Sequence, residues 1–457
     1  MKVVAEWISK AYGTFTVLRH MRAQRRVPYL PPEELRALRD RRVRQIVRYA
    51  AQTVPYYREC FREQGIDAAD IRSAEDLDRL PLLTKEMVRS EPQRFCSTSR
   101  LGREALRMST TGSTAEPLDV YLDRHSILMA AAYGQRQGNA LRTVLGGDMP
   151  RRIVRLGTAG TASARMAAFI QEKSMMRRPP QVLELSTLQP MEEVIEAIND
   201  FRPDSISGYG SYIEPLFRTV ARQGIQMHLP RLVFYGASEI SPSGIRLIEE
   251  EFGVPVMAGY GATEAPHIAF MCERRDGYHV NVDLVHLRLV DAGGESVPQG
   301  QVGEVVVSNL VNRGSVLLNY RLGDLAVLSR EPCPCGRTLP RLANLEGRVR
   351  DPIYLPNGRF VSHYIADLIF YRLSPRQGGE VLQYQLIQWE LDRFELRLAT
   401  VDRAAFDRVA GLFVEELRQT VGDAATIETV YYQGLLPGGR TAKSRRVISF
   451  VGKPRSS

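Results

Sequence analysis

The feature that constrains the fold most is an alternation of short apolar runs with helical stretches between about residues 150 and 290. The apolar runs are RRIVRLG, DSISGYG, PRLVFYGAS and GVPVMAGYG, and stretches such as MEEVIEAINDF and SGIRLIEEEFG separate them. Strands that alternate with helices build βαβ units, in which the strands lie parallel and the helices cover the sheet. The sequence therefore predicts an α/β fold with mostly parallel sheets flanked by helices.

The segments on either side follow other patterns. Residues 32 to 63 carry apolar residues at helical spacing among arginines and glutamates, which predicts surface helices. From about residue 285 the runs LVHLRLVD, GEVVVSNL and LGDLAVLS follow one another closely, which predicts a β-rich subdomain over about 285–345. Near the end, VLQYQLIQWELDRFELRLATVD predicts two strands joined by a polar turn, and AAFDRVAGLFVEELRQTVG an amphipathic helix.

These patterns predict two domains. We expect a large N-terminal domain over residues 1–349 and a small α+β C-terminal domain over 350–457, joined at EGRVRDPIYLPNGR. A chain of 457 residues, 44% of them hydrophobic, exceeds one typical domain and has ample material for two cores.

Composition limits the cellular location and the classes of binding partner that we expect. The chain has no long apolar run, and its first residues interleave charges with apolar residues, so we expect a cytoplasmic location and no membrane partner. The formal charge of +9 suits a solvated basic surface or a phosphorylated small ligand. Because no RNA- or DNA-binding motif accompanies it, we expect no nucleic-acid partner.

A loop rich in hydroxyls and glycine begins at Ser109, in STTGSTAEPLDVYLD. It lies between two strand-like stretches, so its backbone N–H groups and hydroxyls could surround phosphate oxygens. A plain Ser/Thr turn would have the same composition, and no GK[ST] ending marks a Walker loop.

Two further loops, YGASE (235–239) and YGATE (260–264), each follow an apolar run and end in glutamate. In open α/β sheets, ligands collect at the carboxyl ends of the strands. Thr263 could bond phosphate and Glu264 could hold Mg²⁺ as a hard oxygen ligand, although ordinary β-turns would look similar. Asp324, in NYRLGDLAVL, could bond ribose hydroxyls or simply form a turn between strands.

Taken in order, these segments resemble the adenylate-forming enzymes, in the branch of phenylacetate-CoA ligases, coenzyme F390 synthetases and CapK-like proteins. The likeness starts with RQIVRYAAQTVPYYRECFREQGI and LDRLPLLTKEMVR, and continues through STTGSTAEPL, YGASE, YGATEAPHIAFMCE, YRLGD, EGRVRD and the basic tail. It spans roughly residues 35 to 450.

The resemblance implies a role for each motif position. The residues around ATP and AMP would be Ser109, Thr110, Thr111, Gly112, Ser113 and Thr114 in the phosphate loop, Gly236, Ala237, Ser238, Tyr260 and Gly261 at the adenine, and Asp324 at the ribose. Thr263 would touch the α-phosphate, Glu264 would carry Mg²⁺ and Arg348 would lie at the domain junction near the nucleotide.

The resemblance also implies a reaction. Lys443, in TAKSRRV, matches the lysine that bridges the acid's carboxylate and the α-phosphate while the acyl-adenylate forms. The acyl group, aryl or otherwise, would pass to CoA or to a carrier-protein thiol, and the mobile C-terminal domain would rotate between the two steps. Transfer to an amine or hydroxyl stays an alternative.

By analogy with the branch, four residues would line the acid's pocket, although each could equally be a packing residue. They are Tyr133, Gly157, Tyr209 and Gly210. Neither the acid nor the oligomeric state can be read from the sequence, and a homodimer stays open.

The chain departs from the family pattern at several positions. Ala115 and Glu116 stand where glycine and often lysine are usual, Arg350 stands where the hinge commonly has aspartate, and Ala442 replaces a glycine. A basic nucleotide-binding protein without catalysis is therefore a further alternative.

Five cysteines are too few for a disulfide scaffold in a chain of this size. Cys333 and Cys335, in the branch motif CPCGRT, could join Cys272 and His279 in a closed tetrahedral Zn²⁺ site. Buried free thiols are the alternative, and His267 competes as the fourth ligand. Cys60 and Cys96 are interpreted as structural or incidental.

Overall fold

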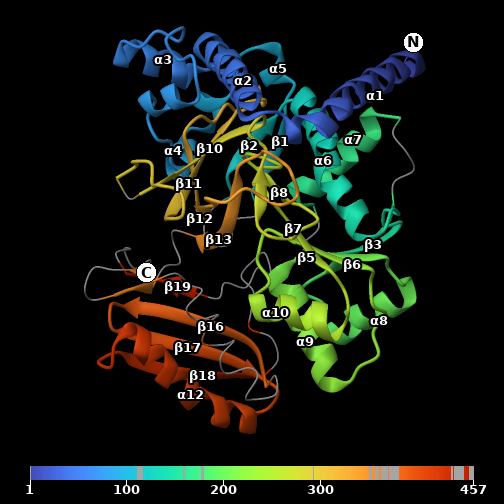
Figure 1. Cartoon of the computed structure of the whole chain (residues 1–457), viewed down its shortest axis with the longest axis vertical. Coiled ribbons are helices and arrows are strands. Elements are labelled where there is room, and N and C mark those ends of the chain that lie inside the picture. Colours follow the sequence, from blue (N-terminus) through green and yellow to red (C-terminus); the bar gives the residue numbers. More distant parts are fainter. Residues whose placement is uncertain are drawn as a thin grey trace. The chain divides into compact units, whose positions relative to one another are not determined.

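The structure is a computed structural model of the whole chain (Figure 1). It describes residues 2–110, 117–157, 160–175, 180–291, 293–348, 353–355, 360–361, 369, 380–433, 436 and 447–451. The chain divides into two compact units. Unit 1 comprises Met1–Arg151, Ala159–Pro180 and Met257–Leu345, and unit 2 comprises Arg152–Thr158, Gln181–Val256 and Glu346–Ser457. The domain boundary expected near residue 350 stays a prediction.

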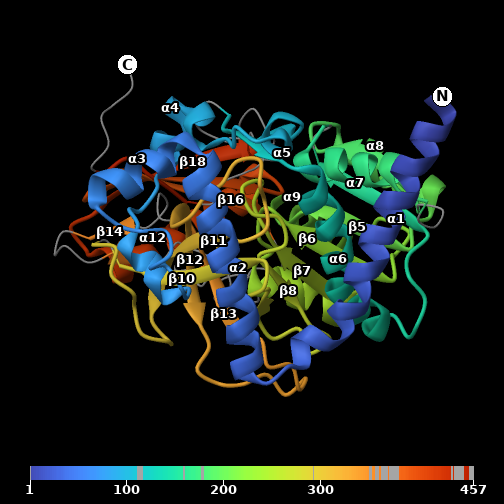
Figure 2. The ribbon, with the colours of Figure 1, turned by 90° about the horizontal axis from the view of Figure 1, so that it is seen from above.

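Helices form much of unit 1. Helix α1 (Lys2–Arg26) lies along α6 (Arg124–Val144) and α7 (Ala162–Lys173), as Figure 2 shows. The helices expected over 32–63 are confirmed as α2 (Pro32–Thr53) and α3 (Pro55–Gln64). They are separate because proline disfavours a helical conformation in the residue before it, and Val54 is extended. Within the described ranges, no helix combines the length and hydrophobicity that crossing a membrane requires.

Short elements connect α3 to the first hairpin. They are η2 (Glu75–Arg79), α4 (Lys85–Ser90), η3 (Pro92–Phe95) and α5 (Arg100–Arg103), and η1 (Val27–Tyr29) links α1 to α2. Strands β1 (Leu106–Ser109) and β2 (Asp119–Leu122) then pair antiparallel. The hydroxyl-rich loop is therefore flanked by two strands, as predicted.

The strands of unit 1 follow the order β10-β11-β12-β13-β9-β8-β7. Their bounds are β7 (Val256–Tyr260), β8 (Ala269–Met271), β9 (Tyr278–Val280), β10 (Val285–Val290), β11 (Val302–Asn309), β12 (Tyr320–Leu328) and β13 (Arg341–Arg348). The β-rich segment expected from 285 is confirmed, because β10, β11 and β12 pair antiparallel. The parallel pattern does not reach 290, however, since β7, β8 and β9 also pair antiparallel. Their connections are shorter than the roughly dozen residues that a parallel crossover needs.

Unit 2 contains the parallel sheet that the alternation predicted, with one strand, over 181–186, that the sequence analysis missed. Strands β3 (Arg152–Gly157), β4 (Gln181–Ser186), β5 (Ser205–Tyr209) and β6 (Leu232–Gly236) run parallel in the order β6-β5-β3-β4. The connecting helices are α8 (Met191–Phe201), α9 (Gly210–Gln223) and α10 (Pro242–Arg246), which continues into η4 (Leu247–Glu251). Helix α8 buries its apolar face through Val194, Ile195 and Ile198, so the βαβ prediction is confirmed.

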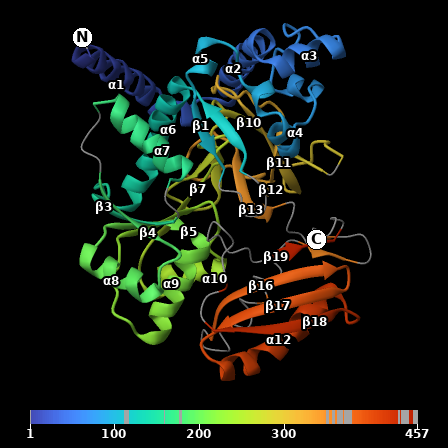
Figure 3. The ribbon, with the colours of Figure 1, turned by 180° about the vertical axis from the view of Figure 1, so that it is seen from behind.

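The C-terminal part of unit 2 is a four-stranded sheet with a helix on one face (Figure 3). Its elements are β16 (Val381–Glu390), β17 (Arg393–Thr400), α12 (Arg403–Val421), β18 (Thr426–Gln433) and β19 (Val447–Ser449), with β14 (Ile353–Tyr354) and β15 (Phe360–Val361) as a small separate pair. Phe406 and Phe413 of α12 share a core with Leu386 and Leu396 of the sheet. The predicted two strands and amphipathic helix are confirmed.

A buried ion pair joins α6 to the segment that follows β9 in unit 1. Arg136 of α6 donates to both carboxylate oxygens of Asp283 at 2.9 Å, and each side chain is only 1% exposed. Tyr133 donates to the same carboxylate at 2.8 Å. Burial alone would raise the pKa of Asp283, but Arg136 and Arg42 outweigh it and hold that pKa below its usual range.

Replacement of Asp283 by alanine should therefore destabilise the protein strongly. The change leaves the Arg136 charge buried without its partner, which typically costs about 3–5 kcal/mol. Urea unfolding followed by circular dichroism measures the loss. Asp407→Ala, which removes an exposed partner of Arg403 on α12, is the control and should barely move the midpoint. Equal midpoints for the two variants would contradict this account of the core.

Candidate functional site

Two of the motif residues meet in unit 1. The Tyr260 hydroxyl, at the end of β7, donates to Oδ2 of Asp324 in β12 at 2.9 Å. Asp324 was expected at a turn between strands, but it lies within β12 at a register shift between β11 and β12. Gly323 has a φ of +78° there, a backbone conformation that glycine adopts without strain. Such a bulge re-aims the side chains next to it, which places Asp324 in reach of Tyr260.

The second acidic motif residue is held by the same strand. Glu264 is 7% exposed, and its Oε1 accepts a hydrogen bond from the Tyr320 hydroxyl at 3.0 Å. Burial and the neighbouring carboxylate raise the pKa of Tyr320, so this hydroxyl remains a donor. The Asn309 side chain also donates to the Glu264 carbonyl at 3.1 Å. We did not predict Tyr320 or Asn309 as supporting residues, although Tyr320 lies inside the motif YRLGD.

The loop between Tyr260 and Glu264 is a tight turn. Ala262 and Ala265 exchange backbone hydrogen bonds of 3.1 and 3.2 Å, so Thr263 lies at the tip between them. A Cβ at Gly261 would lie 3.0 Å from the His267 nitrogen, which explains why a residue without a side chain stands there. Thr263 and Glu264 are therefore held on a short, rigid segment.

The other tyrosine–glycine loop belongs to unit 2. Ala237, just after β6, has a φ of +63°, which is uncommon outside glycine and marks a constrained loop. Ser238 holds the start of α9, because its carbonyl accepts from Gly210 at 3.3 Å and its hydroxyl accepts from the Ser211 nitrogen at 3.1 Å. Gly236, Ala237 and Ser238 are thus beside the end of β5, at the carboxyl ends of the parallel strands, and their place at the adenine stays a prediction.

Three of the residues predicted for the acid pocket adjoin this loop. A Cβ on Gly157, at the end of β3, would lie 3.8 Å from the Tyr209 ring, and Gly210 bonds to Ser238. Their assignment to a pocket stays a prediction. Tyr133 differs, because it is 2% exposed and bonded to Asp283. Its described contacts are those of a core residue and give the pocket assignment no support.

Hydroxyl groups join the two described ends of the hydroxyl-rich loop. Ser109 donates to Asp119 at 2.7 Å, and Thr110 exchanges hydrogen bonds of 2.9 Å with Leu118 across the hairpin. Arg348 ends strand β13, and only its backbone is described. Outside the described residues lie Thr111, Gly112, Ser113, Thr114, Ala115, Glu116, Arg350, Ala442 and Lys443.

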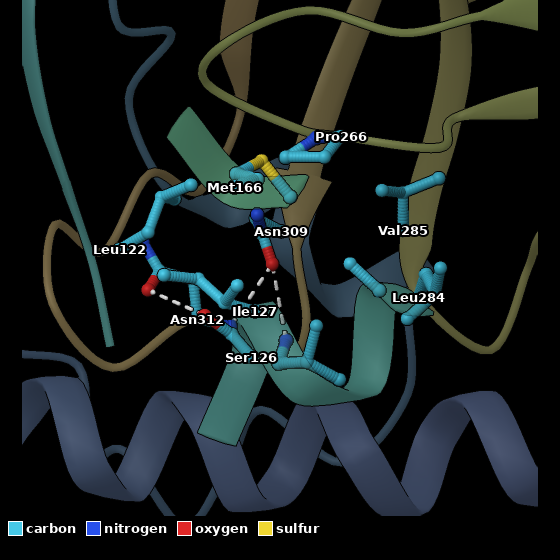
Figure 4. Close-up of a pocket in the computed structure, with 11 residues that line it drawn as sticks. Leu122, Ser126, Ile127, Met166, Pro266, Leu284, Val285, Asn309 and Asn312 are labelled. Carbon is cyan, nitrogen blue, oxygen red and sulfur yellow. Dashed lines mark hydrogen bonds between the residues drawn. The ribbon is translucent and has the colours of Figure 1, made fainter. Parts of the chain in front are cut away.

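A cavity in unit 1 lies near the Glu264 loop, and Figure 4 shows it between the start of α6 and the segments that follow β9 and β11. Its lining is mainly apolar, including Ile127, Met166 and Leu284. The Asn309 and Asn312 side chains form its polar end, but Asn309 is bonded to Glu264 and Asn312 to Ser315 and Tyr121. A lining of this kind does not suit a charged nucleotide.

Three thiols and one imidazole converge elsewhere in unit 1. The ligand atoms of Cys272, His279, Cys333 and Cys335 all lie within 4.8 Å of one another. The Cys272 and Cys333 sulfurs are 3.7 Å apart, and the Cys335 sulfur is 3.3 Å from Nε2 of His279. Tetrahedral zinc with bonds of about 2.3 Å to sulfur and about 2.0 Å to nitrogen would separate such atoms by about 3.8 and about 3.5 Å. The four residues therefore fit a zinc ion, with His279 in the set.

Neighbouring groups prepare these side chains for a metal. The Leu339 carbonyl lies 3.4 Å from Nδ1 of His279, which turns Nε2 toward the sulfurs. Burial lowers the pKa of His279 to about 4, so the imidazole is in the neutral form that metals bind. Burial raises the pKa of Cys272 to about 12, a thiol that a bound metal would have to deprotonate.

Comparisons with known proteins agree with the motifs. Residues 176–313 match the family of AMP-binding enzymes. Phenylacetate-coenzyme A ligase of Thermus thermophilus is 30% identical over 342 residues, which cover 71% of this chain and 73% of that protein. Protein CapK of Staphylococcus aureus is 22% identical over 65% of this chain and 64% of its own length.

A solved structure shows the same fold. It is 2-hydroxyisobutyryl-CoA ligase in the postadenylation state, bound to 2-HIB-AMP, with a TM-score of 0.75 and 20% identity. The match covers 93% of this chain and 91% of that one, which confirms the predicted fold class. Together with the relative from Thermus thermophilus, it leads to one conclusion: the chain belongs to the adenylate-forming enzymes, in the AMP-forming acid–thiol ligase branch of phenylacetate-CoA ligase and CapK-like proteins.

Proposed function

We propose that the protein joins a carboxylic acid to AMP and then transfers the acyl group, aryl or otherwise, to the thiol of CoA. The observation that carries this proposal is the hydrogen bond between Tyr260 and Asp324. It brings together two motifs that lie far apart in the sequence and that the family uses on one nucleotide. The name of the Thermus thermophilus relative supports CoA as the acceptor.

In the first step a carboxylate oxygen attacks the α-phosphorus of ATP, and pyrophosphate leaves. The attacking and attacked groups are both anionic, so the enzyme mainly has to supply fixed positive charge and N–H dipoles. We assign that charge to Lys443, and we assign the α-phosphate contact to Thr263. Mg²⁺, which the family implies, would neutralise phosphate charge and fits the oxygen ligand that Glu264 offers. The Tyr320 hydroxyl would keep this carboxylate in place.

In the second step the thiol sulfur attacks the acyl carbon, the bond to AMP breaks and the thiol proton is released. We assign Asp324 to the ribose hydroxyls in both steps, because a short carboxylate can accept two hydrogen bonds from a diol. Rotation of the C-terminal segment at Arg350 between the steps belongs to the same proposal. A carrier-protein thiol would use the same chemistry.

Lys443→Ala should abolish acid-dependent exchange of pyrophosphate into ATP. The loss of a positioned charge from such a transition state typically costs about a hundredfold to a thousandfold in rate. Exchange is measured with a panel of aryl and alkyl acids, and circular dichroism checks the fold. Lys453→Ala, ten residues further along, is the matched control and should keep full activity.

Two results would overturn parts of the proposal. Full exchange by Lys443→Ala would remove the lysine from the reaction, and no exchange by the wild type with any acid would refute the adenylation itself. The acceptor is tested separately by mass spectrometry of products made with CoA, with an amine or with a hydroxyl compound. An amide or ester formed without CoA, and no thioester with it, would refute the thiol acceptor.

Asp324→Ala should weaken ATP binding more than it slows turnover. The variant removes the proposed ribose acceptor, and a hydrogen bond to a charged group contributes about 1.5–3 kcal/mol. We therefore expect the KM for ATP to rise about tenfold or more, with a smaller fall in kcat. Asp291→Ala alters a turn aspartate that accepts from Glu295 and should leave the KM for ATP unchanged. An unchanged KM in Asp324→Ala would exclude the ribose role.

We also propose that Cys272, His279, Cys333 and Cys335 bind a structural Zn²⁺. All four would be used, so no position would remain open for water, which is typical of structural sites. Arg337 supports the cluster, because its guanidinium and N–H outweigh the effect of burial and lower the pKa of Cys335. The ion would tie the segment after β8 to the segment before β13.

Purified protein should therefore contain about one zinc ion per chain by inductively coupled plasma mass spectrometry. Cys272→Ser should lose the ion and lower the thermal midpoint, because metal binding contributes to folding. Cys60→Ser changes a buried thiol of α3 outside the cluster and should retain the metal. Wild-type protein without zinc after growth in zinc-supplemented medium would leave the cluster as free thiols.

A further inference from the structure

Helix α1 exposes a set of large apolar side chains. The exposed residues are Trp7, Ile8, Tyr12, Phe15 and Leu18, with relative exposures between 52% and 63%. Steps of three, four and seven residues relate the last four, and Trp7 precedes Leu18 by eleven residues, which is about three turns. At 100° per residue all five therefore lie on one face of the helix. A contiguous apolar surface of this kind is rare on a protein that meets only water, and typically marks an interaction site.

The opposite face of α1 is firmly seated, so the exposed residues are not a core face that has turned outward. A Cβ at Gly13 would lie 1.8 Å from the Lys173 carbonyl, which means that the backbones of α1 and α7 meet there. Val17 is fully buried against Leu128 and Ala132 of α6. Figure 1 shows α1 at the surface of unit 1 beside these two helices, with its N-terminal end directed away from them.

Basic residues extend the exposed face toward the C-terminal end of the helix. From Trp7 to Arg26 the helix contains basic residues and no acidic one. The exposed basic residues are Arg19, Arg22, Arg25 and Arg26. At 100° per residue, Arg22 lies on the same side as Phe15 and Leu18. The guanidinium of Arg124, from α6, adds a further cation 5.5 Å from the Tyr12 ring centre.

We propose that α1 docks this protein onto the surface of an anionic phospholipid bilayer. Tryptophan, tyrosine and phenylalanine suit the boundary between headgroups and acyl chains, and the arginines would pair with lipid phosphates. A helix that binds in this way lies in the plane of the interface. Our expectation of no membrane partner rested on the lack of a long apolar run and on the charges among the first residues, and neither excludes a helix that lies in the plane of the interface.

Pairing of α1 with a second copy of itself fits the charges less well. A parallel pair would bring the arginines of the two helices together, which is repulsive. An antiparallel pair would bury guanidiniums against apolar side chains, and residues 7–26 provide no carboxylate to neutralise them. An anionic bilayer supplies an apolar layer for the large side chains and acidic groups for the arginines.

The chain contains two tryptophans, Trp7 and Trp389, so Trp389→Phe leaves Trp7 as the sole tryptophan. In that full-length protein, vesicles of mixed phosphatidylglycerol and phosphatidylcholine should shift the emission to shorter wavelength. Brominated acyl chains should quench it, because Trp7 would enter the boundary region. Vesicles of phosphatidylcholine alone should have a weaker effect, and added salt should reduce binding to the anionic vesicles.

Co-sedimentation of the full chain with the same vesicles tests the apolar and the basic residues of the face separately. Phe15→Glu with Leu18→Glu should abolish binding, and Arg22→Glu with Arg26→Glu should weaken it by about tenfold or more, since each basic residue near an anionic surface contributes to affinity. Leu188→Glu is the matched control, because Leu188 is 69% exposed but lies in unit 2, and it should bind like the wild type. Circular dichroism should be unchanged in all variants.

Three outcomes would overturn the proposal. One is wild-type protein that remains in the supernatant with anionic vesicles. Another is binding by the Phe15/Leu18 variant equal to that of the wild type. The third is a wild-type dimer in analytical ultracentrifugation that this variant abolishes while neither protein binds vesicles, which would assign the face to a second copy of the chain.

Discussion

The buried pair of Arg136 and Asp283 supports more of unit 1 than its own surroundings. Arg136 also donates to Asn281 at 2.7 Å, and Asn281 donates to the His267 carbonyl at 2.8 Å. His267 lies three residues after Glu264, so the hydrogen bonds of the ion pair reach the segment that follows the candidate nucleotide loop. A buried pair contributes little net stability compared with apolar packing, but it permits only one arrangement of its partners. We infer that the pair mainly fixes the positions of the groups around it.

Position matters because adenylation depends on charge that is fixed before the reaction. Tyr260 with Asp324, and Tyr320 with Glu264, each pair a phenol with a carboxylate, and both pairs connect the Tyr260–Glu264 segment to β12. Tyr320 and Asp324 lie four residues apart in β12, on either side of the irregularity at Gly323, so one strand serves both pairs. Binding groups on strands and tight turns lose little freedom when a ligand arrives.

Local patterns predicted the parallel strands β3, β5 and β6, the hairpin of β16 and β17, and helix α12, because each element is specified by its own periodicity. Strand β4 was missed. The antiparallel pairing from β7 onward was missed, since apolar runs look alike in both kinds of sheet and the length of the connections decides. Asp324 was recognised as a motif residue but placed at a turn, because a bulge depends on the partner strand. The Cys333 and Cys335 pair shows the same limit: a C-x-C spacing is weak in sequence, so free thiols and His267 stayed open as alternatives until the fold brought Cys272 and His279 to the pair.

Helix α1 illustrates why periodicity alone can mislead. The face that it turns toward the protein contains Gly13 and Thr16, small or polar residues that permit close approach, and its exposed face contains Trp7 and Phe15. A search for one apolar stripe would assign the large side chains to the core and the small ones to solvent. The packing is reversed because backbone contact with α7 leaves no space for large side chains there. The large apolar side chains on the exposed face indicate that a second apolar surface covers them. The arginines that follow them indicate that this surface is negatively charged.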